Sequence, residues 1–338
     1  MKNLIIPILL FSTLSLAKVT KLYTHQDQIW GLTKVSNTEM IFTTIKGDVF
    51  SFNLKTNKAT NLDIKFPKLK VAGQGGLLDV YFHQDILYFT LSYSAYKSNT
   101  TALAKVSYKD SKVSNYKVIY TANAFEPTTH HYGSRILIKG DKLFMTVGER
   151  GQRDKSQDLT VHNGKVLRLN LDGSIPNDNP YITSDNKSTK AIYSYGHRNP
   201  QGLSVYKDNI YEGEFGPQGG DEINLLAPKA NYGWPIVTFG EEYGGGKIGK
   251  DSKPGFVAPV KHWVPSLSFS DILIHKDYLY LACLGTQQLV RLKFDGKNFT
   301  DQEKLSDNLN DRFRALEAIS DKVYFATDAG VIGYYSVK

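Results

Sequence analysis

The chain has 338 residues, of which 41 % are hydrophobic and 22 % charged, and its 28 glycines and 12 prolines follow no short period. This composition excludes a disordered, collagen-like or low-complexity protein, and the single cysteine, Cys283, excludes an internal disulfide or a thiolate zinc site. The net charge is +8, but the lysines are scattered, so we expect a basic surface that attracts anions and no nucleic-acid site.

The N-terminus has the pattern of a secretory signal peptide. Lys2 precedes an apolar run at 4–11, and small residues end the segment at Ala17. The apolar run is shorter than the roughly 20 residues that a membrane-spanning helix needs. We therefore expect a signal peptide at 1–17, cleavage near Ala17, and a mature domain at 18–338 that is periplasmic or secreted without stable membrane insertion. An uncleaved anchor is the alternative.

A short β-rich run recurs six times along the rest of the chain. Each run alternates β-branched and aromatic residues, as strands require, and the six lie at 40–44, 86–90, 143–147, 209–213, 278–282 and 323–327. Second strands are predicted after three of them, at 49–54, 166–171 and 289–294. Asp-Gly pairs at 172–173 and 295–296 predict hairpin turns.

Six β repeats of about 45–70 residues predict an all-β fold, a six-bladed β-propeller with four-stranded antiparallel blades. A pair of β-sandwiches or another barrel is the alternative. No linker-like stretch divides the chain, so we expect a single domain. Three long segments are expected to be irregular, at 148–164, 174–190 and 213–262. Such loops gather at one end of a propeller's channel, where ligands bind.

Residues that can carry chemistry lie in the expected loops. His131 can act as a base because imidazole titrates near neutral pH. Arg198, Arg312 and Arg314 are permanent cations whose planar forks suit carboxylates. Arg312 and Arg314 alternate on a predicted strand and therefore face the same side, either the channel or the solvent. The structural alternatives are a loop hydrogen bond for His131 and an ion pair between blades for Arg198.

Oxygen atoms suited to Ca²⁺ gather in one segment, where Asp221 and Glu222 follow the glycine-rich backbone around Gly216. The alternative for the two acids is a plain turn and strand start. We expect Trp30 to pack in the core or a loop, and Cys283 to be buried and inert. The sequence has no P-loop and no dinucleotide fingerprint.

Four segments carry a resemblance to a known family. They read GQGGLLDVYFH (73–83), GHRNPQG (196–202), GGDEINLLAPKANYGWP (219–235) and RFRALEA (312–318). In this order, on a six-bladed propeller behind a signal peptide, they resemble the soluble pyrroloquinoline quinone (PQQ)-dependent sugar dehydrogenases of the glucose/sorbosone dehydrogenase family. The aldose sugar dehydrogenase branch is most similar, and the resemblance extends from about residue 30 to residue 328.

The resemblance implies a site at one end of the channel. It makes His131 the general base that takes the C1 hydroxyl proton, with Glu149 placed to orient it. Arg198 is implied to stabilise charge on the reduced cofactor, and Gln74 to contact both sugar and cofactor. The implied cofactor-binding positions are Gln74, Arg198, Asn199, Tyr243, Arg312 and Arg314. The implied Ca²⁺ positions are the backbone carbonyls of Gly216 and Pro217, together with Glu222 and Tyr232.

The implied function is PQQ- and Ca²⁺-dependent oxidation of aldose sugars at C1 to lactones, by hydride transfer to the quinone. The cofactor supplies the redox chemistry and Ca²⁺ polarises its carbonyl. Electrons then pass to an unknown acceptor. The resemblance is compatible with a monomer or a homodimer.

Two positions depart from the family's pattern. The family usually has a lysine near the position of Gly285 and a polar residue at that of Phe215. Losing one charge-assisted contact costs about 1.5–3 kcal/mol, or roughly ten- to a hundredfold in affinity. These changes favour a second hypothesis, a non-catalytic propeller that binds a saccharide or a protein. A third, a Ca²⁺-dependent lactonase, needs several converging oxygen ligands, and the sequence offers one acidic cluster at 221–222.

Overall fold

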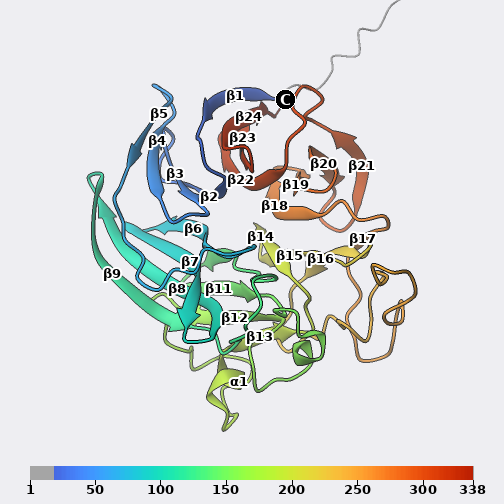
Figure 1. Cartoon of the computed structure of the whole chain (residues 1–338). Helices are drawn as coiled ribbons and strands as arrows, with labels where there is room; N and C mark the ends of the chain where they lie inside the picture. Colours follow the sequence, from blue (N-terminus) through green and yellow to red (C-terminus); the bar gives the residue numbers. More distant parts are fainter. Residues whose placement is uncertain (1–18, 338) are drawn as a thin grey trace, which may run out of the picture.

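Six four-stranded antiparallel sheets follow one another along the chain and stand around a central channel (Figure 1). The computed structural model describes residues 19–337, and the expected signal peptide lies outside the described residues. The predicted fold, a six-bladed all-β propeller with four-stranded antiparallel blades, is confirmed.

The first blade consists of β2 (Ile29–Lys34), β3 (Glu39–Thr44), β4 (Val49–Asn53) and β5 (Lys58–Asn61), and the second of β6 (Leu77–His83), β7 (Ile86–Ala95), β8 (Ser98–Lys109) and β9 (Lys112–Thr121). The third consists of β10 (Ile136–Lys139), β11 (Lys142–Val147), β12 (Lys165–Asn170) and β13 (Ile192–Tyr195), and the fourth of β14 (Pro200–Tyr206), β15 (Asn209–Glu214), β16 (Asp221–Leu225) and β17 (Lys261–Trp263). The fifth consists of β18 (Phe269–His275), β19 (Tyr278–Cys283), β20 (Gln288–Phe294) and β21 (Phe299–Lys304), and the last of β22 (Phe313–Ile319), β23 (Lys322–Thr327), β24 (Val331–Ser336) and β1 (Thr20–Thr24).

The last blade closes the ring with a strand from the other end of the chain. β1 pairs antiparallel with β24, so that Thr20 lies opposite Tyr334 and Thr24 opposite Val331 (Figure 1). Closure of this kind leaves only short, protected sheet edges. It also joins the two ends of the described chain in a single sheet.

The six predicted β-rich runs coincide with the second strand of each blade, from β3 to β23. These strands are buried along almost their whole length, and β19, for example, is buried from Leu279 to Cys283. Each blade packs face to face against its neighbours, so both faces of its inner strands are covered, which explains why this strand carried the clearest signal. Burial raises the pKa of the Cys283 thiol to about 12, as expected for an inert cysteine.

Hydrogen bonds from one innermost strand to the next tie the blades together around the channel. In each case a side-chain oxygen of one blade accepts a bond from a backbone N–H of the following blade. The pairs are Thr33 with Phe82, Asp79 with Ile136, Ser204 with Ile274, Asp271 with Leu316, and Glu317 with Lys34. The polar residues of these strands therefore hold neighbouring blades in register.

Two features differ from the expectations. Residues 213–262 are not wholly irregular, because β16 and β17 complete the fourth blade inside them. The Asp-Gly pair at 295–296 joins paired strands β20 and β21 as predicted, but the pair at 172–173 makes a turn followed by a loop and the short helix α1 (Lys187–Ala191) before β13. A 3₁₀ turn, η1 (Arg153–Ser156), interrupts the loop at 148–164.

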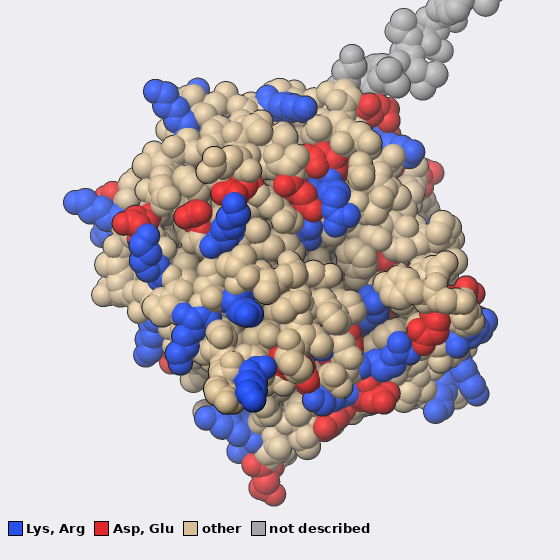
Figure 2. Space-filling model, in the orientation of Figure 1, with Lys and Arg blue, Asp and Glu red and all other residues tan. Residues whose placement is uncertain are grey.

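Within residues 19–337, no helix has the length and hydropathy that a membrane span requires. Figure 2 shows one face of the molecule, with Lys and Arg spread over it and Asp and Glu between them. The basic side chains form no continuous band on this face, in line with their scattered positions in the sequence.

Candidate active site at the channel mouth

A cavity of about 460 Å³ opens at one end of the channel. Most of the site residues implied by the resemblance line it: Gln74, His131, Arg198, Asn199, Tyr243, Arg312 and Arg314. They come from five loops and strand ends separated by up to 240 residues of sequence, and the propeller brings them to a single mouth. Glu149 lies behind His131, and Gly216, Pro217, Glu222 and Tyr232 lie outside this cavity, on two smaller pockets.

His131 is held in an unusual backbone conformation at the cavity wall. Its φ is 53°, in the left-handed region that few residues other than glycine adopt. Its backbone N–H donates to Gln74 Oε1 at 2.8 Å, and its Nδ1 contacts the Glu149 carboxylate. The side chain remains 17 % exposed, and no residue within 19–337 bonds Nε2, so this nitrogen faces the cavity.

The electrostatics of the pair favour a neutral imidazole beside an ionised carboxylate. Burial lowers the pKa of His131 below 6.5; the hydrogen bond to Glu149 opposes this, and the Arg198 charge adds to it. Burial disfavours ionised Glu149, but the contacts with His131 outweigh it and lower the pKa of this carboxyl. A neutral imidazole oriented by a carboxylate has the properties of a general base.

Arg150, which the sequence analysis missed, supports the His131 loop from below. Its side chain is fully buried against the ring of Tyr132, with the guanidinium carbon 3.6 Å from the ring centroid. It donates to the backbone carbonyls of His130 and Thr128 and to Asn99 Oδ1. Its position directly after Glu149 is the signal that was available in the sequence.

Two amide side chains connect the loop to the cavity. Asn199 Oδ1 accepts a bond from the backbone N–H of Gly133 at 3.0 Å, and Gln74 Oε1 accepts the one from His131. Both amides therefore use their oxygen on the backbone of the loop. Their NH₂ groups are left as donors on the cavity side.

Arg198 spans the region between the cavity and the expected Ca²⁺ position. Its Nη1 donates to the carbonyls of Phe215 and Gly216 at 3.0 and 2.9 Å, and its guanidinium lies 5.4 Å from the Trp234 ring centroid. The Gly216 carbonyl predicted as a Ca²⁺ ligand is thus already a hydrogen-bond acceptor. Its second lone pair is what remains for a cation.

The side chains of Arg312 and Arg314 both face the channel, where they share one partner. Asp328 accepts bonds from Nε of both arginines, at 2.7 and 2.8 Å. Burial disfavours ionised Asp328, but Arg314 and Arg312 outweigh it and lower its pKa. Arg314 lies 4.0 Å from the ring centroid of Trp30.

Asp328 and Trp30 were missed as site residues. Trp30 packs in a small core cluster with Leu78 and Tyr132, as expected, and it also lines the cavity. Asp328 follows β23 at the channel end of the last blade, and only its place after a predicted strand could have signalled it. Both act at the site through Arg314.

The two departures from the family pattern lie on the cavity wall. Gly285 and Phe215 both line it. A Cβ atom built on Gly285 would lie 2.8 Å from Ser268 Oγ, so the wall is tight as well as uncharged at this position. The cavity has no lysine among its lining residues.

Two further expected Ca²⁺ residues line a small pocket behind Arg198. Glu222 and Tyr232 line it with Glu214. The Tyr232 hydroxyl donates to the Leu225 carbonyl at 2.6 Å, so that hydroxyl is engaged. Burial and the Glu214 charge raise the pKa of Glu222 well above 4.5, because the two carboxylates lie close together.

Known proteins are similar to this chain in sequence and in fold. Residues 26–332 match the family described as glucose / sorbosone dehydrogenase. The chain is 30 % identical over 327 residues to aldose sugar dehydrogenase YliI of Escherichia coli (strain K12), a match that covers 89 % of this chain and 87 % of that protein. It is 34 % identical over 198 residues to quinoprotein glucose dehydrogenase B of Acinetobacter calcoaceticus, covering 49 % of this chain and 41 % of that protein.

The crystal structure of the soluble aldose sugar dehydrogenase of Escherichia coli in its apo form has a TM-score of 0.88 to this structure, with 28 % identity, covering 95 % of this chain and 99 % of that one. The chain spans 58 % of the length of a further curated relative that it matches. Since the family match extends over most of the chain, the resemblance seen in the four sequence segments is confirmed. The chain belongs to the glucose/sorbosone dehydrogenase family.

Proposed function

We propose that the protein oxidises the C1 hydroxyl of an aldose sugar to a lactone, with PQQ and Ca²⁺ as cofactors. One observation carries the proposal: the His131–Glu149 pair faces an open cavity whose other walls carry Arg198, Arg312 and Arg314. The names of two matched relatives, an aldose sugar dehydrogenase and a quinoprotein glucose dehydrogenase, support the substrate class and the quinone.

The residues at the cavity fit PQQ, a planar quinone that carries carboxylates. Three arginines against a single lining carboxylate, Asp328, leave the cavity positive, and arginine forks suit carboxylates. Arg312 and Arg314 would hold the cofactor carboxylates, while Asn199 and Gln74 would offer amide donors. Bound PQQ would accept the C1 hydride, and Ca²⁺ at the carbonyls of Gly216 and Pro217 would polarise its carbonyl. Glu222 and Tyr232 would hold Ca²⁺ in the pocket behind Arg198.

The chain's own residues then handle the proton. His131 Nε2 takes the proton of the C1 hydroxyl as the C–H bond breaks, and Glu149 holds the imidazole by Nδ1 and balances the charge that it gains. Arg198, whose charge acts on the His131 imidazole, stabilises negative charge in the cavity. The two electrons leave to an acceptor that the proposal does not name, and the sugar keeps a C1 carbonyl within its ring.

The test is calorimetric titration of the Ca²⁺-loaded protein with PQQ, followed by dye reduction with a panel of aldoses. Micromolar or tighter binding, with sugar-dependent dye reduction that is lost in His131→Ala, is the expected result. A folded, Ca²⁺-loaded protein that binds no PQQ would overturn the proposal.

A second candidate function is non-catalytic binding of a saccharide or a protein at the same mouth. The uncharged wall at Gly285 favours it. Saccharide binding by calorimetry without any PQQ binding would decide for this alternative.

We also propose that the protein is exported, with cleavage near Ala17, and acts in the periplasm or outside the cell as a monomer or homodimer. Support comes from the N-terminal sequence pattern. The intact mass of protein recovered from the periplasmic fraction tests this, because cleavage removes the first 17 residues. A full-length mass would contradict it.

A further inference from the structure

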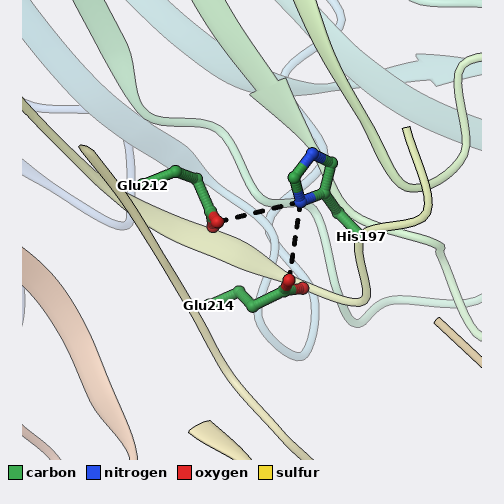
Figure 3. Close-up of side chains that lie close together, drawn as sticks. All are labelled: His197, Glu212 and Glu214. Carbon is green, nitrogen blue, oxygen red and sulfur yellow. Dashed lines mark ion pairs between the residues drawn. The ribbon is translucent and has the colours of Figure 1, made fainter. Parts of the chain in front are cut away.

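A second group of titratable side chains lies behind the cavity, inside the fourth blade. His197 follows β13, and Glu212 and Glu214 alternate on β15, so the two carboxylates share one face. His197 Nδ1 lies 3.7 Å from Glu212 Oε2 and 3.5 Å from Glu214 Oε1 (Figure 3). One potential ligand atom from each residue falls within 4.8 Å of the others.

These side chains are buried and their polar atoms lack partners. The side chains of His197 and Glu212 are 0 % exposed and that of Glu214 is 6 % exposed. Among the described residues, His197 Nδ1, Glu212 Oε1 and the nearby Asn224 Oδ1 have no hydrogen-bond partner. Buried polar atoms without a partner are rare and unfavourable. Unpartnered atoms on three side chains that contact one another indicate a ligand that satisfies them.

The charge of the group also lacks compensation. Glu222 reaches the same spot, since Asn224 Nδ2 lies 3.5 Å from its carboxylate and 3.1 Å from that of Glu214. Within residues 19–337, no Lys or Arg side chain forms an ion pair with Glu212, Glu214 or Glu222. Buried carboxylates are paired, protonated or bound to a metal.

The imidazole also has a hydrogen-bond partner on the side away from the carboxylates. His197 Nε2 lies 2.9 Å from Ser194 Oγ, and the tautomer decides which of the two atoms donates. With its N–H at Nε2, the imidazole donates to the hydroxyl and leaves the Nδ1 lone pair for a cation. Metal-binding histidines are oriented in this way by a bond from their second nitrogen. The Tyr232 ring stacks on the imidazole at 4.8 Å and fixes its plane.

We propose that His197 Nδ1, Glu212 and Glu214 bind a divalent transition-metal cation, such as Zn²⁺ or Mn²⁺, as a structural site inside the fourth blade. Imidazole together with carboxylate oxygens suits these ions, whereas Ca²⁺ takes oxygen ligands only. In a tetrahedral site with bonds of about 2.1 Å, ligand atoms are about 3.4 Å apart, close to the 3.5 and 3.7 Å observed. Asn224 Nδ2 donates to the same two carboxylate oxygens, at 3.1 Å from Glu212 Oε2 and from Glu214 Oε1, and holds them in place.

This site adjoins the Ca²⁺ position proposed at Glu222 and Tyr232, since Glu214 lines the same pocket as those two residues. None of its three ligands, His197, Glu212 and Glu214, belongs to the proposed Ca²⁺ positions, and the site does not rest on the proposed function. The site is nevertheless coupled to the cavity, because the second oxygen of Glu214 accepts the backbone N–H of Arg198 at 2.6 Å. A bound ion therefore fixes the backbone of a cavity-lining arginine.

The test is a titration of chelator-stripped protein with Co²⁺, whose visible absorption reports tetrahedral nitrogen and oxygen coordination, combined with thermal unfolding. We expect intense visible bands and a rise in melting temperature. Glu212→Gln keeps the volume and polarity of the side chain but should bind one Co²⁺ fewer. Glu317→Gln makes the same change at a half-buried carboxylate on β22, in the last blade, and should bind as much as the wild type.

Two results would overturn the proposal: folded wild-type protein that gives neither the bands nor the shift, or Glu212→Gln that binds as much Co²⁺ as Glu317→Gln. Either would mean that shared protons neutralise the cluster. If Glu212→Gln does not fold, X-ray absorption at the cobalt edge of the wild type decides. A shell of one imidazole with carboxylates supports the site, and a shell without imidazole refutes it.

Discussion

The two ends of the channel carry similar residue types in different states. At the first, the His131–Glu149 pair and the arginines on Asp328 surround a cavity of about 460 Å³. At the second, Asp79, Asp271 and Glu317 line a cavity of about 580 Å³. Both ends are polar and both are hollow, so neither polarity nor volume distinguishes a binding site here.

The difference is in the partners of the polar groups. At the second end each carboxylate accepts a backbone N–H of the next blade. At the first end charged side chains pair with one another and leave further donors directed into the cavity. Side chains whose polar atoms are all hydrogen-bonded to the backbone hold blades together. Side chains with unpaired donors or acceptors are available to a ligand.

Arg135 separates the two ends. It pairs with Asp79 at 2.8 Å, and it donates to the carbonyls of Gln201 and Arg314, which line the first cavity. Its own side chain lines the second. The fully buried guanidinium is therefore a structural plug, and its variants should affect stability rather than chemistry.

The largest effect is expected from the base. His131→Ala should lower kcat/KM for sugar-dependent dye reduction by about 10²–10⁴, because no other group can take the hydroxyl proton in the same place. Urea unfolding should show little change, since the side chain is at the cavity surface. A loss of less than tenfold would contradict its role as the base.

Arg135→Leu should show the opposite pattern. It leaves Asp79 and Asp271 buried without their cation, which should reduce the free energy of unfolding by about 3–5 kcal/mol, measured by urea unfolding. Lys276→Ala, which removes an exposed pair with Asp321, is the control and should cost less than about 1 kcal/mol. Equal costs for the two variants would show that Arg135 is not a buried plug.

A lysine introduced at position 285 should strengthen cofactor binding at the first end of the channel. Gly285→Lys combined with Ser268→Gly, which removes the closest neighbour of the new Cβ, should tighten PQQ binding about ten- to a hundredfold. Calorimetry measures this, with Ser268→Gly alone as the control. Unchanged affinity would mean that bound cofactor does not approach this wall.

The pH profile tests the Glu149 contact. Activity requires neutral His131, so kcat/KM should fall as the pH drops through the pKa of this residue, which burial places below 6.5. The Glu149 bond raises that pKa, so Glu149→Gln should move the acid limb to lower pH and reduce kcat. Glu242→Gln, an exposed carboxylate nearby, should leave the limb in place. A limb displaced to higher pH would contradict the assignment.

Asp271 at the second end should make stability depend on pH. Burial, opposed by Arg135 and helped by Asp79, raises the pKa of Asp271 from 3.8 to about 7. A carboxyl with a raised pKa in the folded state loses stability as the pH rises between these two values. Asp271→Asn should therefore gain stability relative to the wild type as the pH rises from about 4 to about 7, measured by urea unfolding. A difference that stays constant over this range would show that the group is ionised throughout.

Local sequence was sufficient for the six repeats and for the second strand of each blade. These strands combine β-branched and aromatic residues in short runs, so all six are visible without any long-range information. The fourth blade shows the limit: β16 reads DEINL and begins with two carboxylates. Its strand character depends on burial against neighbouring strands, which no local pattern displays.

The site residues likewise fall into those that the sequence identified and those that only the structure showed. Residue chemistry and the motif resemblance together named Gln74, His131, Arg198, Arg312 and Arg314, and these line one cavity. They did not name Asp328 or Trp30 as site residues, because the roles of these two arise from contact with Arg314 and not from a pattern of their own.

The sequence alone determined the repeat, the second strands and the motif residues, because hydrophobic alternation and short motifs are properties of neighbouring residues. Tertiary structure decided which polar groups are hydrogen-bonded within the protein and which remain available to a ligand. Arg135 as a plug and His197 against Glu212 both depend on contacts between separate strands and blades. Partners of this kind are set by closure of the ring, since residues far apart in the chain become neighbours only when all six blades are in place.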